Sequence, residues 1–245
     1  MTITIVNIIM QSKIITCNHE KNFCKINNVI NPTKTIEIVA KNNLGLIHVY
    51  TGEGKGKTSA AMGLALRAVG QGFKVYIIQF MKGGAYTGEF ISIKNFLPNI
   101  DAVQYGRKCV LEDKQRKLMG LEDEYHYFNF VRDDIECGPC RFCFLNDETQ
   151  KQYVRDAMER TRKILTSGDY DLVVLDEVNC AIQWKFLAEK ELIDALKAKN
   201  KTTEVICTGR DAPKELIEIA DYASEIKSIK HPFNKGIPAR RGIEY

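Results

Sequence analysis

The sequence predicts an α/β fold in which a mostly parallel β-sheet is flanked by helices. From residue 46 onward, short runs rich in β-branched and aromatic residues alternate with longer stretches of helical character, which is typical of parallel sheets with crossover helices. A glycine-rich segment, TGEGKGKT at residues 51–58, follows the first of these runs and precedes a helical stretch. We therefore expect a ligand site at the carboxyl edge of the sheet, where that segment would lie.

The expected elements follow in order from this alternation. The first strand is expected at residues 46–50, and a helix rich in Ala and Gly, whose small side chains let it lie close to a sheet, at about 58–69. The remaining elements are expected as strands at 74–80, 101–105, 171–177, 203–207 and near 224–229, a polar helix at about 148–165, and further helices before and between the last strands.

Two parts of the chain do not fit the alternation. Residues 1–44 are rich in Ile, Asn and Lys and carry no legible chemistry, so we expect an N-terminal extension that could form short strands. Residues 106–147 hold four of the eight cysteines and are expected to be an insertion. Residues 45–245 are thus expected to form one domain that contains this Cys-rich insertion.

Composition and charge exclude several classes of protein. At 245 residues, with 44% hydrophobic and 27% charged residues, the chain has the composition of a globular protein. Its net charge of +4 is spread along the chain, which argues against nucleic acid or an anionic membrane as the main partner. No apolar run approaches the roughly 18 residues that span a bilayer, and the start MTITIVNIIM lacks the basic region of a signal peptide. We expect a cytoplasmic protein whose cysteines are reduced thiols or metal ligands.

The segment at residues 52–58 carries the strongest chemical signal. Gly52, Gly54 and Gly56 permit the positive φ angles that turn successive backbone N–H groups inward, and the following helix adds the positive end of its dipole. Together these features predict a cradle for an anion such as phosphate.

Two side chains complete this cradle. Lys57 would place its charge on the phosphates, and the Thr58 hydroxyl would bind the accompanying magnesium ion. The strict pattern G-x-x-x-x-G-K-[ST] requires a glycine where this chain has Thr51. A glycine-rich turn with solvated lysines is the alternative, but the order strand, loop, Lys-Thr and helix favours a P-loop NTPase-like fold.

A second acidic element supports the first. The apolar run LVVL delivers Asp176 and Glu177 at its carboxyl end, which is the edge where ligands bind in open α/β sheets. Asp176 is placed to hold magnesium directly or through water, and Glu177 either joins it or acts as a base. Adjacent carboxylates also occur at helix starts, where they only complement the helix dipole.

Five stretches of the chain match one family. They are VYTGEGKGKTSAAMGLALRAVGQGFKV, QFMKG, DLVVLDEVNCAI, TGRDAP and KHPFNKGIPARRGIEY. Together, over about residues 45–105 and 164–245, they resemble the ATP:corrinoid (cob(I)alamin) adenosyltransferases that make adenosylcobalamin. The loop with Thr51 in place of the first glycine is the form that this family carries.

The resemblance implies an enzyme in which the Co(I) of a reduced corrinoid attacks the 5′ carbon of ATP, so that the whole triphosphate leaves. Lys57, Thr58 and Glu177 are then the catalytic residues, because with magnesium they stabilise charge on the departing triphosphate without a general base. The magnesium ligands implied are Thr58, Asp176 and Glu177. The residues implied in nucleotide binding are Gly52, Glu53, Gly54, Lys55, Gly56, Lys57, Thr58, Ser59, Arg67 and Arg210.

Other implications concern partners and one departure from the family. The resemblance implies a corrinoid substrate, an electron donor such as a flavoprotein, and a homodimer. For Arg67, the alternative to nucleotide binding is a solvated arginine on the helix surface. Well-known members carry aromatic residues against the corrin after the strand expected at 101–105, whereas this chain continues Gly106-Arg107-Lys108-Cys109. The resemblance therefore assigns no corrin-contact residue.

The insertion contains a C-x₂-C-x₂-C array formed by Cys137, Cys140 and Cys143. Cys109 would supply a fourth thiolate, with His126 as an alternative ligand. Four thiolates suit tetrahedral zinc or an iron–sulfur cluster, and spacing does not decide between them. Unligated cysteines in a loop and a thioredoxin-type redox dithiol stay open as alternatives.

Two other functions also stay open when the residues are considered without the resemblance. A phosphate-loop ATPase or nucleotide kinase would share the loop and the acidic strand, and would release ADP instead of triphosphate. A regulatory nucleotide-binding protein, with an insertion that senses metal or redox state, would bind nucleotide without acting on a corrinoid.

Overall fold

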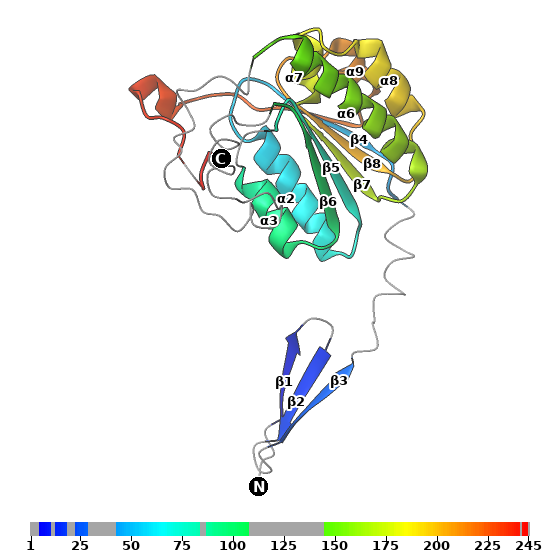
Figure 1. Cartoon of the computed structure of the whole chain (residues 1–245), viewed down its shortest axis with the longest axis vertical. Coiled ribbons are helices and arrows are strands. Elements are labelled where there is room, and N and C mark those ends of the chain that lie inside the picture. Colours follow the sequence, from blue (N-terminus) through cyan, green and yellow to red (C-terminus); the bar gives the residue numbers. More distant parts are fainter. Residues whose placement is uncertain are drawn as a thin grey trace, which may run out of the picture. The chain divides into compact units, whose positions relative to one another are not determined.

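The computed structural model describes residues 5–10, 13–18, 23–28, 43–83, 87–107, 145–240 and 242–244. They belong to two compact units, Met1–Asn42 and Asn43–Tyr245 (Figure 1). The predicted metal ligands Cys109, Cys137, Cys140 and Cys143 lie outside the described residues, so the cysteine site stays a prediction.

The first unit contains a three-stranded antiparallel sheet. Its strands, in the sheet order β1-β2-β3, are Ile5–Met10, Lys13–Asn18 and Phe23–Asn28. Short strands therefore do form in the N-terminal part of the chain. The register of β2 and β3 places Cys17 opposite Cys24.

The second unit is built on a six-stranded sheet in the order β6-β5-β7-β8-β4-β9. All neighbouring pairs are parallel. The strands are β4 Ile47–Thr51, β5 Val75–Phe80, β6 Ile100–Tyr105, β7 Leu172–Asp176, β8 Glu204–Thr208 and β9 Tyr222–Glu225. The predicted α/β class is confirmed, and this sheet, expected to be mostly parallel, is parallel throughout its described strands.

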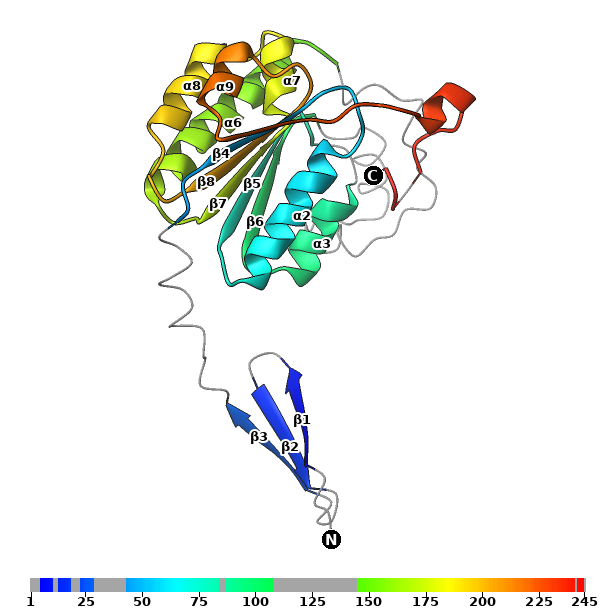
Figure 2. The ribbon, with the colours of Figure 1, turned by 180° about the vertical axis from the view of Figure 1, so that it is seen from behind.

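Helices cover both faces of this sheet (Figures 1 and 2). One face carries α2 Lys57–Gly70 and α3 Gly88–Phe96, and the other carries α6 Glu148–Ser167, α7 Val178–Gln183, α8 Glu189–Lys197 and α9 Lys214–Ile219. Among the described residues, no helix is both long and apolar enough to cross a bilayer.

The side chains of β5 show how this double cover follows from the sequence. Ile77 packs in a cluster with Ala61 and Ala65 of α2, whereas its neighbour Ile78 packs in a second cluster with Met158 of α6. Because successive residues of a strand point to opposite faces, a strand covered on both sides has to be apolar throughout. All six residues of VYIIQF are buried, and the one polar residue among them, Gln79, is hydrogen-bonded to Asp176.

The last strand differs from the expectation. It was expected near residues 224–229, but β9 ends at Glu225. The Ile226 N–H still donates to the Thr51 carbonyl oxygen of β4 at 2.8 Å, but the Ile226 carbonyl oxygen accepts from the Gly54 N–H of the glycine-rich segment at 2.7 Å, so the pairing with β4 stops there. The C-terminal tail therefore starts in contact with the predicted phosphate loop.

Candidate nucleotide-binding site

The glycine-rich loop, residues 52–56, joins the end of β4 to the start of α2. Gly52 and Gly56 have φ angles of +98° and +116°, a region that side chains with a Cβ atom rarely adopt. Gly54 is required for a different reason, because a Cβ atom there would lie 2.7 Å from the Ile226 carbonyl oxygen. Helix α2 begins directly after Gly56, so its first free N–H groups face the loop.

Lys57 extends across this loop. Its Nζ atom donates to the carbonyl oxygens of Gly52 at 2.6 Å and Gly54 at 2.8 Å, and the residue is only 8% exposed. The structure thus brings the predicted lysine to the centre of the loop. A phosphate in the cradle would meet both the backbone N–H groups and this ammonium.

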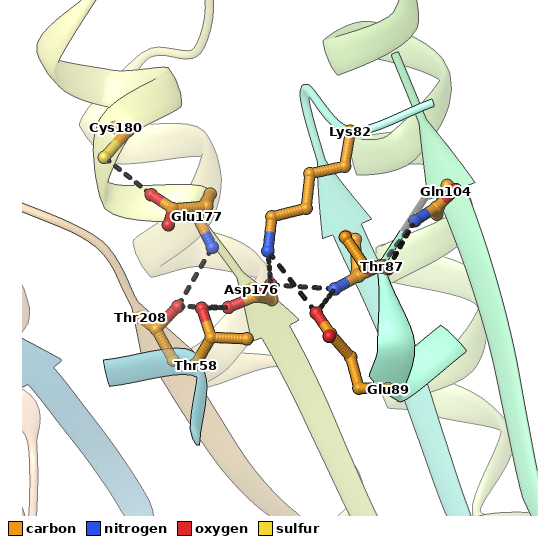
Figure 3. A network of polar contacts seen from close by, with 10 residues as sticks. Thr58, Lys82, Thr87, Glu89, Gln104, Asp176, Glu177, Cys180 and Thr208 are labelled. Atoms are coloured by element: carbon orange, nitrogen blue, oxygen red, sulfur yellow. Dashed lines mark hydrogen bonds and ion pairs between the residues drawn. The ribbon is translucent and has the colours of Figure 1, made fainter. Parts of the chain in front are cut away.

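The carboxylate of Asp176, at the end of β7, is the centre of the polar network in Figure 3. Its Oδ1 atom accepts hydrogen bonds from the hydroxyls of Thr58 at 2.9 Å and Thr208 at 2.8 Å. Its Oδ2 atom accepts from Lys82 Nζ at 2.7 Å and Gln79 Nε2 at 3.0 Å. Burial alone would raise the pKa of Asp176, but the Lys82 ammonium and these hydrogen bonds hold the pKa below its ordinary value.

Glu177 follows directly but has different surroundings. Its φ angle of +64° is left-handed, its N–H donates to the Thr208 hydroxyl at 3.0 Å, and its side chain reaches Cys180 of α7 (Figure 3). There Cys180 Sγ donates to Glu177 Oε2 at 2.9 Å. Burial, followed by the negative charge of Glu177, raises the pKa of Cys180 to about 12, so the thiol stays protonated and remains a donor.

Asp176 and Glu177 therefore differ in their capacity to accept a further hydrogen bond or ligand. A carboxylate accepts about four hydrogen bonds, and Asp176 receives four from the described residues around it. Glu177 is half-buried, and in the described part of the chain the thiol of Cys180 is the side chain that donates to it. Glu177 is thus the carboxylate that can accept a further ligand.

The donor atoms at this edge fit magnesium. Thr58 gives its hydroxyl proton to Asp176, which leaves the lone pairs of the Thr58 oxygen for a cation. Among the described residues, no group of three or more His, Cys, Asp or Glu side chains is placed to hold a metal. Magnesium in nucleotide sites takes only one or two side chains, together with water and phosphate oxygens, and the Thr58 hydroxyl beside the Asp176 carboxylate is compatible with such a site.

The other residues predicted to bind the nucleotide do not all lie at the glycine-rich loop. Arg210, just after β8, forms an ion pair of 3.0 Å with Glu53 of the loop, and Ser59 lies exposed in the first turn of α2. Arg67 is exposed in the last turn of the same helix, about 15 Å along the helix axis from Lys57 at the usual rise per residue. The structure therefore brings Arg210 to the loop and does not bring Arg67 there.

The C-terminal tail also reaches the loop. Lys55 Nζ lies 3.0 Å from Glu244 Oε1, and the bond between Gly54 and Ile226 lies at the start of the same tail. The segments TGRDAP and KHPFNKGIPARRGIEY, which are far from the loop in sequence, thus supply the partners of Glu53 and Lys55.

Reasoning from the sequence does not select Gln79, Lys82 and Thr208. The signal for them is present, because each is a polar residue at or just beyond the carboxyl end of β5 or β8. Only the strand order, with β7 between β5 and β8, shows that all three converge on Asp176.

These features together define a phosphate-loop nucleotide-binding protein: a glycine cradle before a helix, a lysine across it, and a Thr–Asp pair at the carboxyl edge of a parallel sheet. The chain also matches the family model described as ATP:corrinoid adenosyltransferase BtuR/CobO/CobP, over residues 43–145 and 122–245. It therefore belongs to this family of transferases.

Individual relatives agree with the family match. The chain is 32% identical to the corrinoid adenosyltransferase of Escherichia coli (strain K12) over 206 residues, covering 84% of this chain and 88% of the relative. The corrinoid adenosyltransferase CobA of Salmonella typhimurium (strain LT2) gives the same identity and coverage. That of Pseudomonas aeruginosa is 30% identical, covering 84% of this chain and 86% of the relative. The resemblance seen in the motifs is confirmed, and the ATPase, kinase and regulator alternatives are not favoured.

Proposed function

We propose that this protein transfers the 5′-deoxyadenosyl group of ATP to the Co(I) of a reduced corrinoid and releases triphosphate, in the biosynthesis or salvage of adenosylcobalamin. The observation that carries the proposal is the family match across nearly all of the second unit. The loop geometry supports it, because the cradle suits a polyphosphate anion.

The chemistry follows from the two substrates. The electron pair of Co(I) forms the new cobalt–carbon bond to the 5′ carbon, and the electrons of the carbon–oxygen bond leave with the triphosphate. Negative charge therefore grows on the departing oxygen, where the loop N–H groups and the Lys57 ammonium would stabilise it. No proton has to be removed, so no general base is needed.

The roles of the acidic residues follow from their hydrogen bonds. Thr58, Glu177 and, through water, Asp176 would hold magnesium, which when bound would supply positive charge to the triphosphate oxygens. Asp176 holds the Thr58 hydroxyl in place through the 2.9 Å bond. Glu177 is proposed as a metal ligand rather than a base, with its carboxylate fixed by the Cys180 thiol.

The charged residues of the loop complete the nucleotide site. Glu53, Lys55, Ser59 and Arg210 lie on or beside the loop, and we assign them to the nucleotide. The exposed position of Arg67 supports its alternative as a solvated helix arginine.

Further parts of the proposal rest on the sequence and the resemblance. We propose a zinc or iron–sulfur site formed by the cysteines at positions 109, 137, 140 and 143, an electron donor such as a flavoprotein, and a homodimer. We also propose a cytoplasmic location and a catalytic domain at residues 45–245 with an extension at 1–44. Metal analysis of protein purified without oxygen tests the cysteine site, and metal-free protein with full activity would reject it.

The proposed function is tested by incubating the protein with ATP, magnesium and chemically reduced cobalamin. Formation of the cobalt–carbon bond, with one triphosphate released per adenosylated corrinoid, is the expected result. Release of ADP and phosphate without a cobalt–carbon bond would overturn the proposal.

A further inference from the structure

The ammonium of Lys82 lies at the carboxyl edge of the sheet, beside the residues proposed to bind magnesium. Its Nζ atom lies 2.7 Å from Asp176 Oδ2 and 4.0 Å from Glu89 Oε1. The side chain is 17% exposed, and that of Asp176 is fully buried. A lysine is an ammonium at neutral pH, and the ion pair with Asp176 holds this one in the site. The site therefore contains a positive charge of its own.

This ammonium shares its carboxylate with the proposed metal ligand. Asp176 accepts from Lys82 through one oxygen and from Thr58 through the other (Figure 3). A divalent cation bound at the Thr58 oxygen would thus lie near the Lys82 ammonium and be repelled by it. With Asp176 neutralised, the carboxylates of Glu177 and Glu89 carry the remaining attraction for a metal.

The backbone around Lys82 holds it in this position. Met81 has a left-handed φ angle of +57°, and its carbonyl oxygen accepts from Gln150 Nε2 of α6 at 3.3 Å. A Cβ atom at Gly83 would lie 2.0 Å from the Gly106 carbonyl oxygen, so the turn depends on close contact of two backbone segments. A strained turn fixed from two sides indicates a defined place for the side chain.

We propose that Lys82 is an internal counter-ion that keeps divalent metal out of the site until a triphosphate is present. The inference rests on the proposed function, which assigns the loop to the triphosphate of ATP. The added phosphate charges attract the metal more strongly than one ammonium repels it. Metal binding then depends on the triphosphate, and the order of loading is built into the protein.

The test measures Mn²⁺ binding to the full-length protein without nucleotide, by electron paramagnetic resonance, with Mn²⁺ as the probe for magnesium. Lys82→Gln keeps a hydrogen-bond donor to Asp176 but removes the charge, and it is expected to raise the affinity for Mn²⁺ at least tenfold. The matched control is Lys190→Gln, which removes an 82% exposed lysine from its ion pair with Asp194 on α8, and it should leave the affinity unchanged. Equal Mn²⁺ affinity of Lys82→Gln and the wild type would overturn the proposal.

The Lys82→Gln variant leaves the buried charge of Asp176 without a counter-ion and is therefore at risk of folding poorly. A second measurement, on the wild type, covers that case. Magnesium alone should leave the melting temperature of the wild type unchanged, whereas magnesium with inorganic triphosphate should raise it by several degrees. A wild type stabilised equally by magnesium alone would overturn the proposal. Cobalt–carbon bond formation is measured separately, so a failure of the counter-ion proposal is distinguished from a failure of the proposed function.

Discussion

The two edges of the six-stranded sheet use carboxylates in opposite ways. At the carboxyl edge, Asp176 collects four side-chain donors from three segments and stays fully buried. At the amino edge, Glu204 accepts from the backbone N–H groups of Gly45 and Leu46, both at 2.7 Å, and Asp221 accepts from that of Ile47 at 2.8 Å. The first arrangement brings side chains together, and the second secures the start of β4.

Backbone strain is also concentrated at the carboxyl edge of the sheet. Of the four described non-glycine residues with positive φ, Met81, Glu177 and Asp211 follow β5, β7 and β8 at the carboxyl edge. Strain and buried charge are retained where they position reacting groups. Changes at the carboxyl edge should therefore mainly affect ligand binding, and changes at the amino edge should mainly affect stability.

The largest effect is expected for Lys57→Ala. Losing a charge that stabilises the leaving triphosphate should cost about 3 kcal/mol or more, which is about a hundredfold in rate. The adenosylation rate with saturating magnesium measures it, and circular dichroism should show an intact fold. Lys190→Ala, on the surface of α8, is the control. Wild-type turnover of the Lys57 variant would remove the loop from the mechanism.

The next effect is expected at the amino edge, for Glu204→Gln. The carboxylate also lies 2.6 Å from His48 Nε2, and loss of these charge-assisted bonds should lower the free energy of unfolding by about 2 kcal/mol. Urea unfolding measures this loss, and the affinity for ATP should not change. A variant with normal stability and weakened ATP binding would contradict the division between the edges.

The pH dependence of the stability of Glu204→Gln, compared with that of the wild type, provides a second test of the role of Glu204. Burial alone would raise the pKa of Glu204, but His48 and the two N–H groups lower it below its ordinary value. The stabilisation is therefore present above about pH 4.3, the ordinary value for Glu, and is lost as the pH falls through the lower folded pKa. Wild type should lose more stability than Glu204→Gln between pH 5 and pH 3, roughly the window set by that shift.

A smaller effect is expected for Glu177→Gln, which should raise the magnesium concentration for half-maximal rate about tenfold. Asp176→Asn should raise it as well, and should also lower the melting temperature because Lys82 loses its counter-charge. Magnesium titration of the adenosylation rate separates the two variants. If Glu177→Gln kept a normal magnesium requirement and lost only ATP hydrolysis, Glu177 would be a base.

The smallest effect is expected for Cys180→Ala. The thiol donates to Glu177, and its loss should raise the magnesium requirement by only about threefold, because a thiol is a weak donor. Cys180→Ser keeps a donor and should restore most of the wild-type value. Equal requirements for the Ala variant and the wild type would show that the thiol does not position Glu177.

The sequence is sufficient to predict those features that depend on local pattern. The loop, its lysine and threonine, and the strand that ends in Asp176 each have a recognisable local spacing, and the structure has strand, loop and helix in the expected order. The end of β9 is not predictable in this way, because it depends on the contact of Ile226 with the loop.

Long-range partners are the part that local pattern does not reveal. Lys82 in QFMKG looks like any lysine after a strand, and its contact with Asp176 spans 94 positions. Thr208, Glu53 and Lys55 also contact residues that are far away in the sequence, namely Asp176, Arg210 and Glu244. Such contacts depend on strand order and on the path of the tail, which the hydrophobic pattern of each segment does not encode.

The most direct test of the central claim is to follow the oxygen atom that bridges the 5′ carbon and the α-phosphate of ATP. ATP labelled at that position with a heavy oxygen isotope is incubated with magnesium, chemically reduced cobalamin and the wild-type protein, and the products are examined by mass spectrometry. If the carboxyl edge binds a departing triphosphate, the label leaves entirely in triphosphate and the adenosyl group is bound to cobalt without it. Label found in ADP, released together with phosphate, would show that a phosphorus–oxygen bond is broken and would contradict the account.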